Sequence, residues 1–347
     1  MRIFVLQFVI SVLITGVLRR YLGRHGLLDL PNARSSHAVP VPRGGGLAIV
    51  VTFLPAVFWA FERHLISDRL AWALIGGGCA IAVIGFLDDR YRLAAWPRMV
   101  VHSLAAAWAI WCFSNERSTH FSAVSFGDWV GSCVAFLALV WLTNLFNFMD
   151  GIDGLAGVEA VCVSGLGAVL MLRGGSPGVA QVLLMLCAAS LGFLVWNWPP
   201  AKIFMGDVGS GFLGFTLGTC ALFSTANNRQ FIWPWAILLA VFIVDATITL
   251  LRRILARAPW YQAHRSHAYQ HAARTLGSHA KVTLLVAAIN IVWLFPLAWA
   301  ASRFQKIAAL SAAVAAVPLL YLALRFQAGR EEPAAQARVS ELTHSVN

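Results

Sequence analysis

The chain has 347 residues, of which 59% are hydrophobic and only 12% are charged. A water-soluble enzyme of this length does not need so much apolar side chain to fill its core, so the composition favours a protein that sits in lipid. The formal net charge of +11 fits attraction to anionic headgroups or to phosphorylated substrates, and we expect no nucleic acid among the partners.

Eleven apolar runs, separated by short polar joints, divide the chain. Each is close to the roughly 20 residues that a helix needs to cross a hydrocarbon core of roughly 30 Å. The sequence therefore predicts an all-α integral membrane protein of about eleven transmembrane helices, with one catalytic domain over residues 1–325 and a mobile cytoplasmic tail over 326–347. The runs centre on residues 3–18, 45–61, 70–87, 97–113, 126–146, 155–172, 178–196, 208–226, 231–250, 282–300 and 305–324.

The positions of Lys and Arg predict the orientation of these helices. If the N-terminus lies outside, 18 of the 26 basic residues fall in cytoplasmic segments and eight fall in exterior ones. Cytoplasmic loops of membrane proteins hold such an excess of basic residues. We therefore expect the N-terminus outside the cell and the C-terminus in the cytoplasm.

The Asp, Asn and His side chains gather in the loops that this orientation places in the cytoplasm. A structural membrane protein has no reason to collect them on one face, whereas a site for a cytosolic substrate does. A transporter is the alternative class, but it should carry polar groups near the middle of the membrane, where Asp245 is the acidic residue deepest in a run. The five loops cover residues 29–46, 86–92, 144–157, 197–211 and 257–274.

Two adjacent carboxylates, Asp88 and Asp89, end the third run. Acidic side chains beside a membrane span are costly, so such a pair usually has a task. Either the pair is a solvated helix end facing Arg90 and Arg92, or one carboxylate holds a divalent cation while the other handles a proton.

Amide and acid side chains follow one another in the third loop. Three of them recur every three residues, so on a helix they form one stripe that can face a cavity. Gly151 and Gly154 then break the helix and let the backbone approach a ligand. One carboxylate could be a helix cap, but a cap does not need four such groups. The four residues are Asn144, Asn147, Asp150 and Asp153.

Asp207 follows Gly206 and precedes a new apolar run, which places its carboxylate near the start of a helix. It could simply cap that helix. Free N–H groups at a helix start also favour anions, and a carboxylate beside them can share a hard cation with a diphosphate.

Basic side chains mark the last and the first of these loops. Arg and His together suit phosphate, because a guanidinium binds its oxygens and an imidazole can donate a hydrogen bond to a leaving phosphate. Alternatively, these are the ordinary basic residues of cytoplasmic loops. The last loop holds His264, Arg265, His267 and His271, and the first holds Arg34, His37 and Arg43, which are candidates for contacting phosphate or a lipid headgroup.

Taken together, the motifs between about 29 and 271 resemble those of the polyprenyl-phosphate N-acetylhexosamine-1-phosphate transferases. The resemblance rests on the order and spacing of the acidic pair, the series ending in DGIDGLAG, the Phe204-Met205-Gly206-Asp207 block and Asn197 ten residues before Asp207. The histidine motif HRSHAYQ is most similar to that of the family's O-antigen initiating enzymes.

This resemblance implies transfer of an N-acetylhexosamine 1-phosphate from a UDP-sugar to undecaprenyl phosphate, with release of UMP, in the inner membrane of a bacterium. Magnesium is the implied cofactor, with manganese as a substitute. The implied catalytic residues are Asp88, Asp89, His264 and His267, and the implied metal ligands are Asp207 and Asp89. Substrate binding falls to Asn144, Asn147, Asp150, Asp153, Asn197, Phe204, Arg265, Arg43 and His37.

Several alternatives stay open at this stage. Arg90, Tyr91 and Arg92 stand where some members carry a third Asp, so the donor could be UDP-linked N-acetylfucosamine, N-acetylquinovosamine or N-acetylglucosamine. A phospho-N-acetylmuramoyl-pentapeptide transferase is the alternative within the family. The lipid phosphate could attack the donor directly, or an Asp of the pair could form a covalent intermediate. A homodimer is also open.

Overall fold

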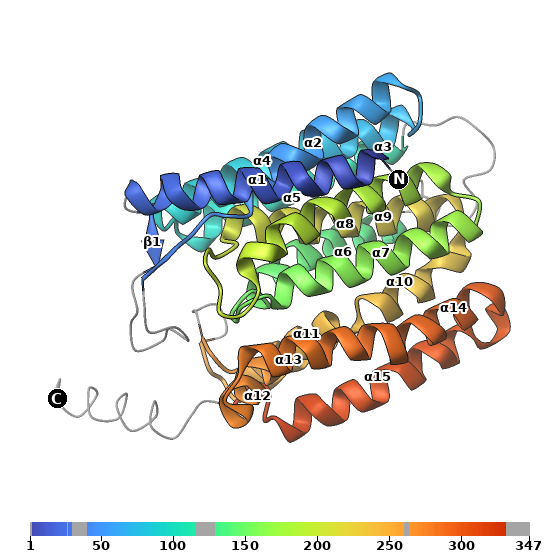
Figure 1. Ribbon diagram of the computed structural model, residues 1–347. Helices are drawn as coiled ribbons and strands as arrows, with labels where there is room; N and C mark the ends of the chain where they lie inside the picture. The colour runs from blue at the N-terminus through green and yellow to red at the C-terminus, as the bar shows by residue number, and fades with distance from the viewer. Residues whose placement is uncertain (1, 26, 30–39, 115–128, 260–263, 331–347) are drawn as a thin grey trace.

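The computed structural model describes residues 2–25, 27–29, 40–114, 129–259 and 264–330, and these residues are almost entirely helical (Figure 1). Two short strands, β1 (Leu28–Asp29) and β2 (Val41–Pro42), pair antiparallel with Leu28 opposite Pro42 and Asp29 opposite Val41. This small sheet lies between the first two helices and directs the chain towards the second.

Fifteen α-helices form in the described residues. Two pairs of them are joined by π-helical turns, Ala73–Gly77 and Ile289–Leu294, and so make continuous long helices. The helices are α1 (Arg2–Arg24), α2 (Leu47–Glu62), α3 (Asp68–Trp72), α4 (Gly78–Tyr91), α5 (Ala95–Ser114), α6 (Trp129–Phe148), α7 (Leu155–Arg173), α8 (Pro177–Asn197), α9 (Asp207–Asn227), α10 (Ile232–Leu238), α11 (Ala240–Leu255), α12 (Ala268–Leu276), α13 (His279–Ala288), α14 (Phe295–Arg303) and α15 (Ala308–Arg325).

Eight helices in the described part of the chain are long and apolar enough to cross a membrane. Their number confirms an all-α, multi-pass membrane protein. They are Ile3–Arg24, Asp68–Tyr91, Trp129–Phe148, Leu155–Arg173, Pro177–Asn197, Asp207–Asn227, His279–Arg303 and Gln305–Arg325.

The remaining predicted runs are not among these eight candidate spans of the described residues. The run at 231–250 is bent by 71° between Arg229–Leu238 and Ala240–Leu255, and this pair makes a ninth span if it is taken as one. The run at 45–61 forms α2, which has only 16 residues, and the run at 97–113 lies in α5. Eleven crossings and the N-out orientation therefore stay predictions.

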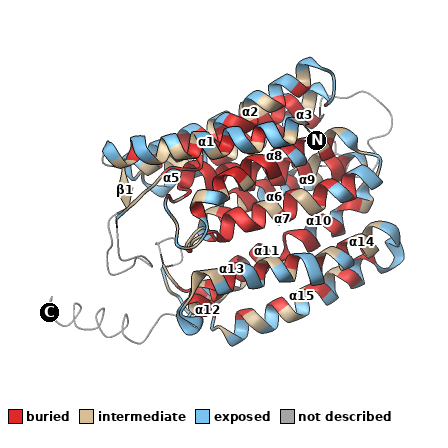
Figure 2. Cartoon of the chain, viewed as in Figure 1, coloured by how far each residue is buried: buried red, intermediate tan, exposed pale blue. Residues whose placement is uncertain are grey.

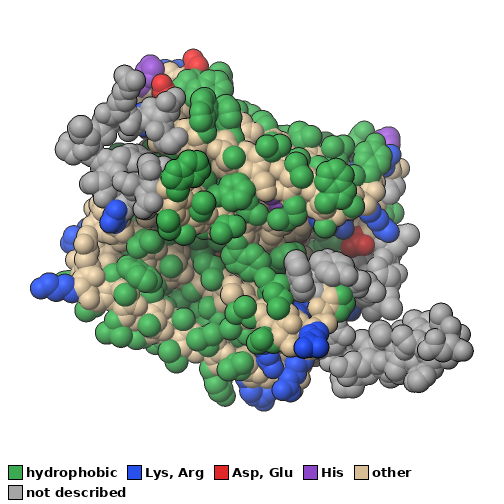
Figure 3. All heavy atoms as spheres, turned by 180° about the vertical axis from the view of Figure 1, so that it is seen from behind, with side chains coloured by type: hydrophobic (Ala, Val, Ile, Leu, Met, Phe, Trp, Pro, Cys, Tyr) green, Lys and Arg blue, Asp and Glu red, His purple; other side chains and the backbone are tan. Residues whose placement is uncertain are grey.

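The surface carries the apolar band that lipid requires. Hydrophobic side chains dominate the middle of the face in Figure 3, and Lys and Arg gather towards its edges. On α1, Leu6, Leu13 and Val17 are each at least half exposed, although the helix is strongly apolar. Such a helix is stable only with its outer face in hydrocarbon.

Helix α9 lies at the centre of the bundle, among α2, α4, α6, α7 and α8. Within its most apolar window 89% of the residues are buried, the highest share among the eight candidate spans of the described chain. Figure 2 shows the buried residues on the inner faces of these helices. A helix surrounded by protein can carry polar groups at its start without exposing them to lipid.

The boundary expected at residue 325 stays a prediction. Residues 326–330 form a turn in which Ala328 is fully buried and the Gly329 N–H donates to the carbonyl of Ser266 at 2.6 Å. Residues 331–347 lie outside the described part of the chain.

Candidate active site

The end of α4 meets the beginning of α9. Asp88 and Asp89 lie in the last turn of α4, and Asp207 is the first residue of α9. A Cβ atom at Gly85 would lie 2.6 Å from the Asp207 carbonyl oxygen, so only glycine allows this approach of the two helices. The sequence correctly placed both carboxylate groups at helix ends, and the fold brings those ends together.

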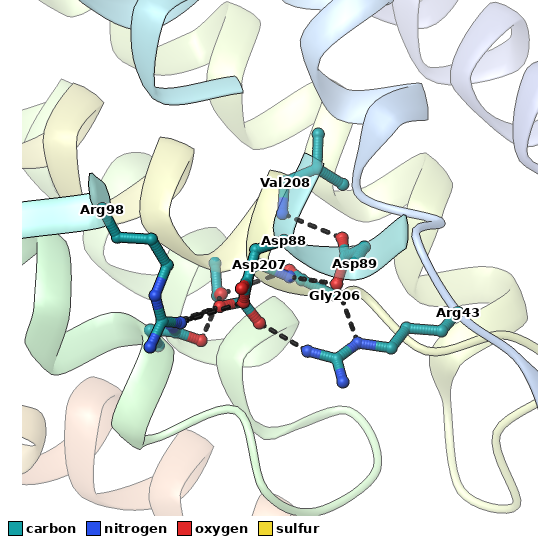
Figure 4. A network of polar contacts seen from close by, with 9 residues as sticks. Arg43, Asp88, Asp89, Arg98, Gly206, Asp207 and Val208 are labelled. Carbon is teal, nitrogen blue, oxygen red and sulfur yellow. Dashed lines mark hydrogen bonds and ion pairs between the residues drawn. The ribbon is translucent and has the colours of Figure 1, made fainter. Parts of the chain in front are cut away.

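Asp89 caps α9 from outside that helix. Its Oδ1 accepts the N–H of Asp207 at 2.9 Å and its Oδ2 accepts the N–H of Val208 at 3.1 Å (Figure 4). The residue before α9, Gly206, has a φ of +75°, and a Cβ there would lie 2.4 Å from Asp89 Oδ2. The Asp89 side chain is only 2% exposed. It thus satisfies N–H groups that a helix start leaves without intrahelical partners.

The Asp207 carboxylate is held by three donors. Its Oδ1 accepts from Arg43 Nη2 at 2.5 Å, and its Oδ2 accepts from Arg98 Nη1 at 2.7 Å and from Asn147 Nδ2 at 2.8 Å. The same Arg98 nitrogen also donates to Asp88 Oδ2 at 3.0 Å. One positive group therefore bridges the carboxylates of two different helices.

Arg43 is brought to this cluster by backbone pairing between two loops. Arg43 and Phe204 form a parallel bridge, in which the Phe204 N–H donates to the Pro42 carbonyl at 2.8 Å. Arg43 Nε also donates to Asp89 Oδ1 at 2.8 Å. Although burial lowers the pKa of Arg43, the charges of Asp207 and Asp89 hold that pKa above its ordinary value, so the guanidinium stays charged.

The third loop is only partly helical, which corrects the expected stripe. Helix α6 ends at Phe148, so Asn144 and Asn147 share the helix but Asp150 follows it. Asn144 donates to the Val140 carbonyl, whereas Asn147 reaches the site. Burial, together with the nearby carboxylates of Asp207 and Asp89, raises the pKa of Asp150 well above its ordinary value despite the opposing charge of Arg43.

Asn197 and Asp153 connect the loops around the site. Asn197 Oδ1 accepts the Gly154 N–H at 3.1 Å, and its Nδ2 donates to the Ile203 carbonyl at 2.9 Å. Asp153 Oδ2 accepts the Ala201 N–H at 3.0 Å. These contacts hold the segment between α6 and α7 against the segment before α9. They position the loops from which nucleotide contacts were expected.

The two motif histidines lie together beside the end of α6. The rings of His264 and His267 stack with centroids 5.0 Å apart, and the His267 ring stacks on Phe148 at 6.4 Å. Burial, with smaller contributions from His267 and Arg253, lowers the pKa of His264 to about 3, so its imidazole is uncharged near neutrality.

A cavity of about 270 Å³ opens beside the histidine loop. Arg265 and Arg274 are the basic residues in its wall, and Gly151 of the third loop faces them. The sequence-predicted Arg265 therefore borders a space next to Asp150 and Asp153. The full lining is Gly151, Ile152, Arg265, Gln270, Ala273, Arg274, Gly277, Ser278 and His279. His37 lies outside the described residues.

Similarity to known proteins decides the family. The sequence model described as glycosyl transferase family 4 matches residues 71–225. A probable undecaprenyl-phosphate N-acetylglucosaminyl 1-phosphate transferase of Bacillus subtilis is 33% identical over 83% of this chain and 82% of its own length. The chain belongs to glycosyl transferase family 4.

Other relatives of this family 4 transferase point to the same chemistry. A decaprenyl-phosphate N-acetylglucosaminephosphotransferase of Mycolicibacterium smegmatis is 30% identical over 80% of the chain and 76% of its own length. A phospho-N-acetylmuramoyl-pentapeptide-transferase of Lactobacillus helveticus is 26% identical over 72% of the chain and 81% of its own length. The expected family and enzyme class are thereby confirmed, and the transporter alternative loses its support.

The donor set of this family 4 transferase fits magnesium at two carboxylates. In the described chain no three His, Cys, Asp or Glu side chains are grouped so as to hold a metal ion. Magnesium, however, is usually bound by one or two carboxylates, with water and substrate phosphates completing its shell. Asp88 and Asp207 already share one cationic partner, Arg98. Asp89, which was expected to be a ligand, has its oxygens directed at α9 and Arg43 instead.

Sequence reasoning assigned no site role to two charged residues that hold several polar partners in the fold. Arg98 begins an apolar run and was counted as an ordinary positive-inside residue, and Asp245 was noted only in weighing a transporter. A charged group in a largely apolar segment was the available signal, because such a position is costly without a partner. Only the fold shows the partners, which for Arg98 are Asp88 and Asp207.

Proposed function

We propose that this family 4 transferase moves an N-acetylhexosamine 1-phosphate from a UDP-sugar to undecaprenyl phosphate and releases UMP. The main support for this proposal is the ion-pair cluster in which Arg98 bridges Asp88 and Asp207 while Arg43 bridges Asp89 and Asp207. The relatives of Bacillus subtilis and Mycolicibacterium smegmatis act on undecaprenyl and decaprenyl phosphate, and their names favour N-acetylglucosamine over the other sugars.

The arrangement of charges suits a reaction between two anions. A phosphate monoester has a second pKa of about 6, so the lipid phosphate is mostly a dianion near neutrality and needs little deprotonation. Repulsion from the diphosphate is then the main obstacle, and Arg43 and Arg98 are placed to offset it. When bound, a magnesium ion held by Asp88 and Asp207 would neutralise further charge on the diphosphate.

We propose direct attack as the mechanism. An oxygen of the lipid phosphate bonds to the β-phosphorus of the donor, the bond from that phosphorus to the bridging oxygen breaks, and UMP leaves with this oxygen. Asp88 is the carboxylate that accepts any proton remaining on the lipid phosphate. Asp89 already accepts two backbone N–H groups, which supports a positioning role for it over a nucleophilic one.

The setting we propose is the inner membrane of a bacterium, where the product starts an O-antigen or another lipid-linked cell-envelope glycan. The apolar band and the polyprenyl-phosphate relatives support this setting. Transfer of phospho-N-acetylmuramoyl-pentapeptide is the second candidate, supported by a relative at lower identity. The homodimer stays a prediction.

The test is a reconstituted assay with purified protein in lipid nanodiscs. We expect labelled lipid product and equimolar UMP with UDP-N-acetylglucosamine, undecaprenyl phosphate and magnesium, and no product from Asp207→Asn. The UDP-linked N-acetylfucosamine, N-acetylquinovosamine and muramoyl-pentapeptide donors are assayed beside it. Lipid product from none of the three N-acetylhexosamine donors would overturn the proposal, and product from the pentapeptide donor alone would favour the second candidate.

A further inference from the structure

One face of α11 carries a buried polar stripe that has no part in the cluster around Asp207. Asp245, Thr249 and Arg253 follow one another at intervals of four residues, which places them on the same side of the helix. Their exposed fractions are 7%, 0% and 1%. Burying an acid and a base in a membrane protein is costly unless each one has polar partners.

Asp245 holds the start of α12 and the histidine beside it. Its Oδ1 accepts the N–H of Ala268 at 3.0 Å, and its Oδ2 accepts the N–H of Tyr269 at 2.9 Å. Thr249 Oγ1 donates to Oδ1 at 3.1 Å, and His267 Nδ1 lies 3.2 Å from the same oxygen. The Asp245 carboxylate of α11 therefore caps the start of α12, as Asp89 caps the start of α9.

The residue in the N-cap position of α12 is His267. Ser, Thr, Asp or Asn at this position would cap the helix without any buried acid from a neighbouring helix. The chain instead carries a histidine there and supplies the carboxylate from α11. Asp245 therefore both caps the helix and contacts the imidazole ring.

The contacts of Asp245 determine where the proton of His267 resides. An ionised carboxylate only accepts hydrogen bonds, and Asp245 already receives two backbone N–H groups and a hydroxyl. His267 Nδ1 must then be the donor in their contact. In that contact the ring has the Nδ1–H tautomer, in which Nε2 carries no hydrogen and can only accept.

The other histidine is held by the same stripe through a serine. Arg253 Nη1 donates to Ser266 Oγ at 3.4 Å and Nη2 donates to the Pro259 carbonyl at 3.2 Å. Ser266 Oγ is in turn 3.0 Å from His264 Nδ1. One face of α11 thus orients both histidines of the HRSHAYQ motif.

We propose that Asp245 is a positioning residue of the transfer reaction, acting through His267. It fixes the ring orientation and the Nδ1–H tautomer, so that neutral His267 presents Nε2 as an acceptor to a substrate O–H group. His267 donates to a phosphate only as an imidazolium, whose charge Asp245 offsets. The proposal rests on the role of His267 in the proposed function, and the tests below separate the two.

The first test is a double-mutant cycle with Asp245→Asn, His267→Gln and the double variant. Loss of the hydrogen-bond partner behind a functional histidine costs about 10–100-fold where it has been measured at metal sites. We expect a fall of this order in kcat for Asp245→Asn, with KM for the UDP-sugar within about twofold, and no further fall when it is added to His267→Gln. Falls that multiply in the double variant would overturn the proposal.

A matched control is Glu159→Gln, another exchange of a buried helical acid for its amide. Glu159 is fully buried in α7, and its Oε2 accepts from Asn290 Nδ2 at 2.7 Å. We expect its activity to equal that of the wild type. A fall equal to that of Asp245→Asn would show that loss of any buried acid suffices, and would overturn the proposal.

The second test reads the tautomer directly and does not depend on catalysis. Nitrogen-15 spectra of histidine-labelled wild-type protein, with His267→Gln used for assignment, should show the hydrogen of His267 on Nδ1. A neutral His267 with its hydrogen on Nε2 would overturn the proposal even if Asp245→Asn failed to fold. If the tautomer is Nδ1–H but His267→Gln is fully active, the positioning stands and the assigned role of His267 fails.

Discussion

The Asp89 carboxylate accepts the backbone N–H of Asp207 at 2.9 Å, so the last turn of α4 holds the first residue of α9 in place. The family resemblance implies that Asp89 and Asp207 are both metal ligands, but the two carboxylates have different partners in the fold. Asp89 accepts from two backbone N–H groups and Arg43, whereas the Asp207 carboxylate accepts from the side chains of Arg43, Arg98 and Asn147.

Metal binding should therefore respond differently to the two carboxylates. We expect Asp207→Asn to abolish Mn²⁺ binding, measured by electron paramagnetic resonance on the purified protein. Asp89→Asn should leave Mn²⁺ affinity nearly unchanged and lower the free energy of unfolding by about 1–3 kcal/mol, because one buried N–H loses its acceptor. Loss of Mn²⁺ binding in Asp89→Asn with an unchanged unfolding midpoint would make Asp89 a ligand.

The bridging guanidinium gives a second prediction. Removing it in Arg98→Gln leaves Asp88 and Asp207 facing each other without their shared cation, and their repulsion is strong at a partly buried site. We expect kcat to fall by at least about tenfold. Arg90→Gln is the control, since Arg90 is exposed in the last turn of α4. Equal activity of the two variants would show that Arg98 contributes only the general positive charge of cytoplasmic segments.

Gly206 allows a clean test of the close approach at the site. Gly206→Ala adds a Cβ that would lie 2.4 Å from Asp89 Oδ2, at a residue with φ of +75°. Gly175→Ala is the matched control, because Gly175 has φ of +77° and open space around its missing Cβ. We expect both to lose about 1 kcal/mol of stability from backbone strain, and only Gly206→Ala to lose transfer activity. An active Gly206→Ala would show that the Asp89 contact can shift freely.

Direct attack predicts that no half-reaction occurs. Lipid-free purified protein given UDP-sugar and magnesium should release no UMP and should not exchange labelled UMP until undecaprenyl phosphate is added. A covalent sugar phosphate on Asp88 or Asp89 would instead release one UMP per protein molecule. Stoichiometric release, measured by rapid quench, would establish the covalent route.

Acid stability should depend on His264. Burial lowers the pKa of His264 to about 3 in the folded protein, whereas a histidine in the unfolded chain titrates near 6.5. The unfolded state therefore binds the proton first, and this contribution to stability is present above pH of about 6.5 and is lost as the pH falls towards 3. When the pH is lowered from 7.5 to 5, we expect the unfolding midpoint of His264→Gln to fall by less than that of the wild type. Equal losses would show that His264 is accessible to protons in the fold.

Sequence alone determined the class of the protein and the identity of most chemical groups. An apolar run is readable from composition, because a helix in lipid needs only length and hydrophobicity. The spacing of the acidic pair, the Asn and Asp series and the FMGD block was sufficient for the family. Local motifs also placed Asp89 and Asp207 correctly at helix ends.

What each group contacts was decided only by the tertiary structure. Arg43, Asp88, Arg98 and Asp207 come from four separate segments, and their ion pairs depend on how α4, α5 and α9 pack rather than on any local pattern. The same holds for Asp245, whose partners at and beside the start of α12 follow it by more than twenty residues. A carboxylate reads the same in sequence whether it binds a cation or caps a distant helix, because the difference lies in the donors that folding places around it.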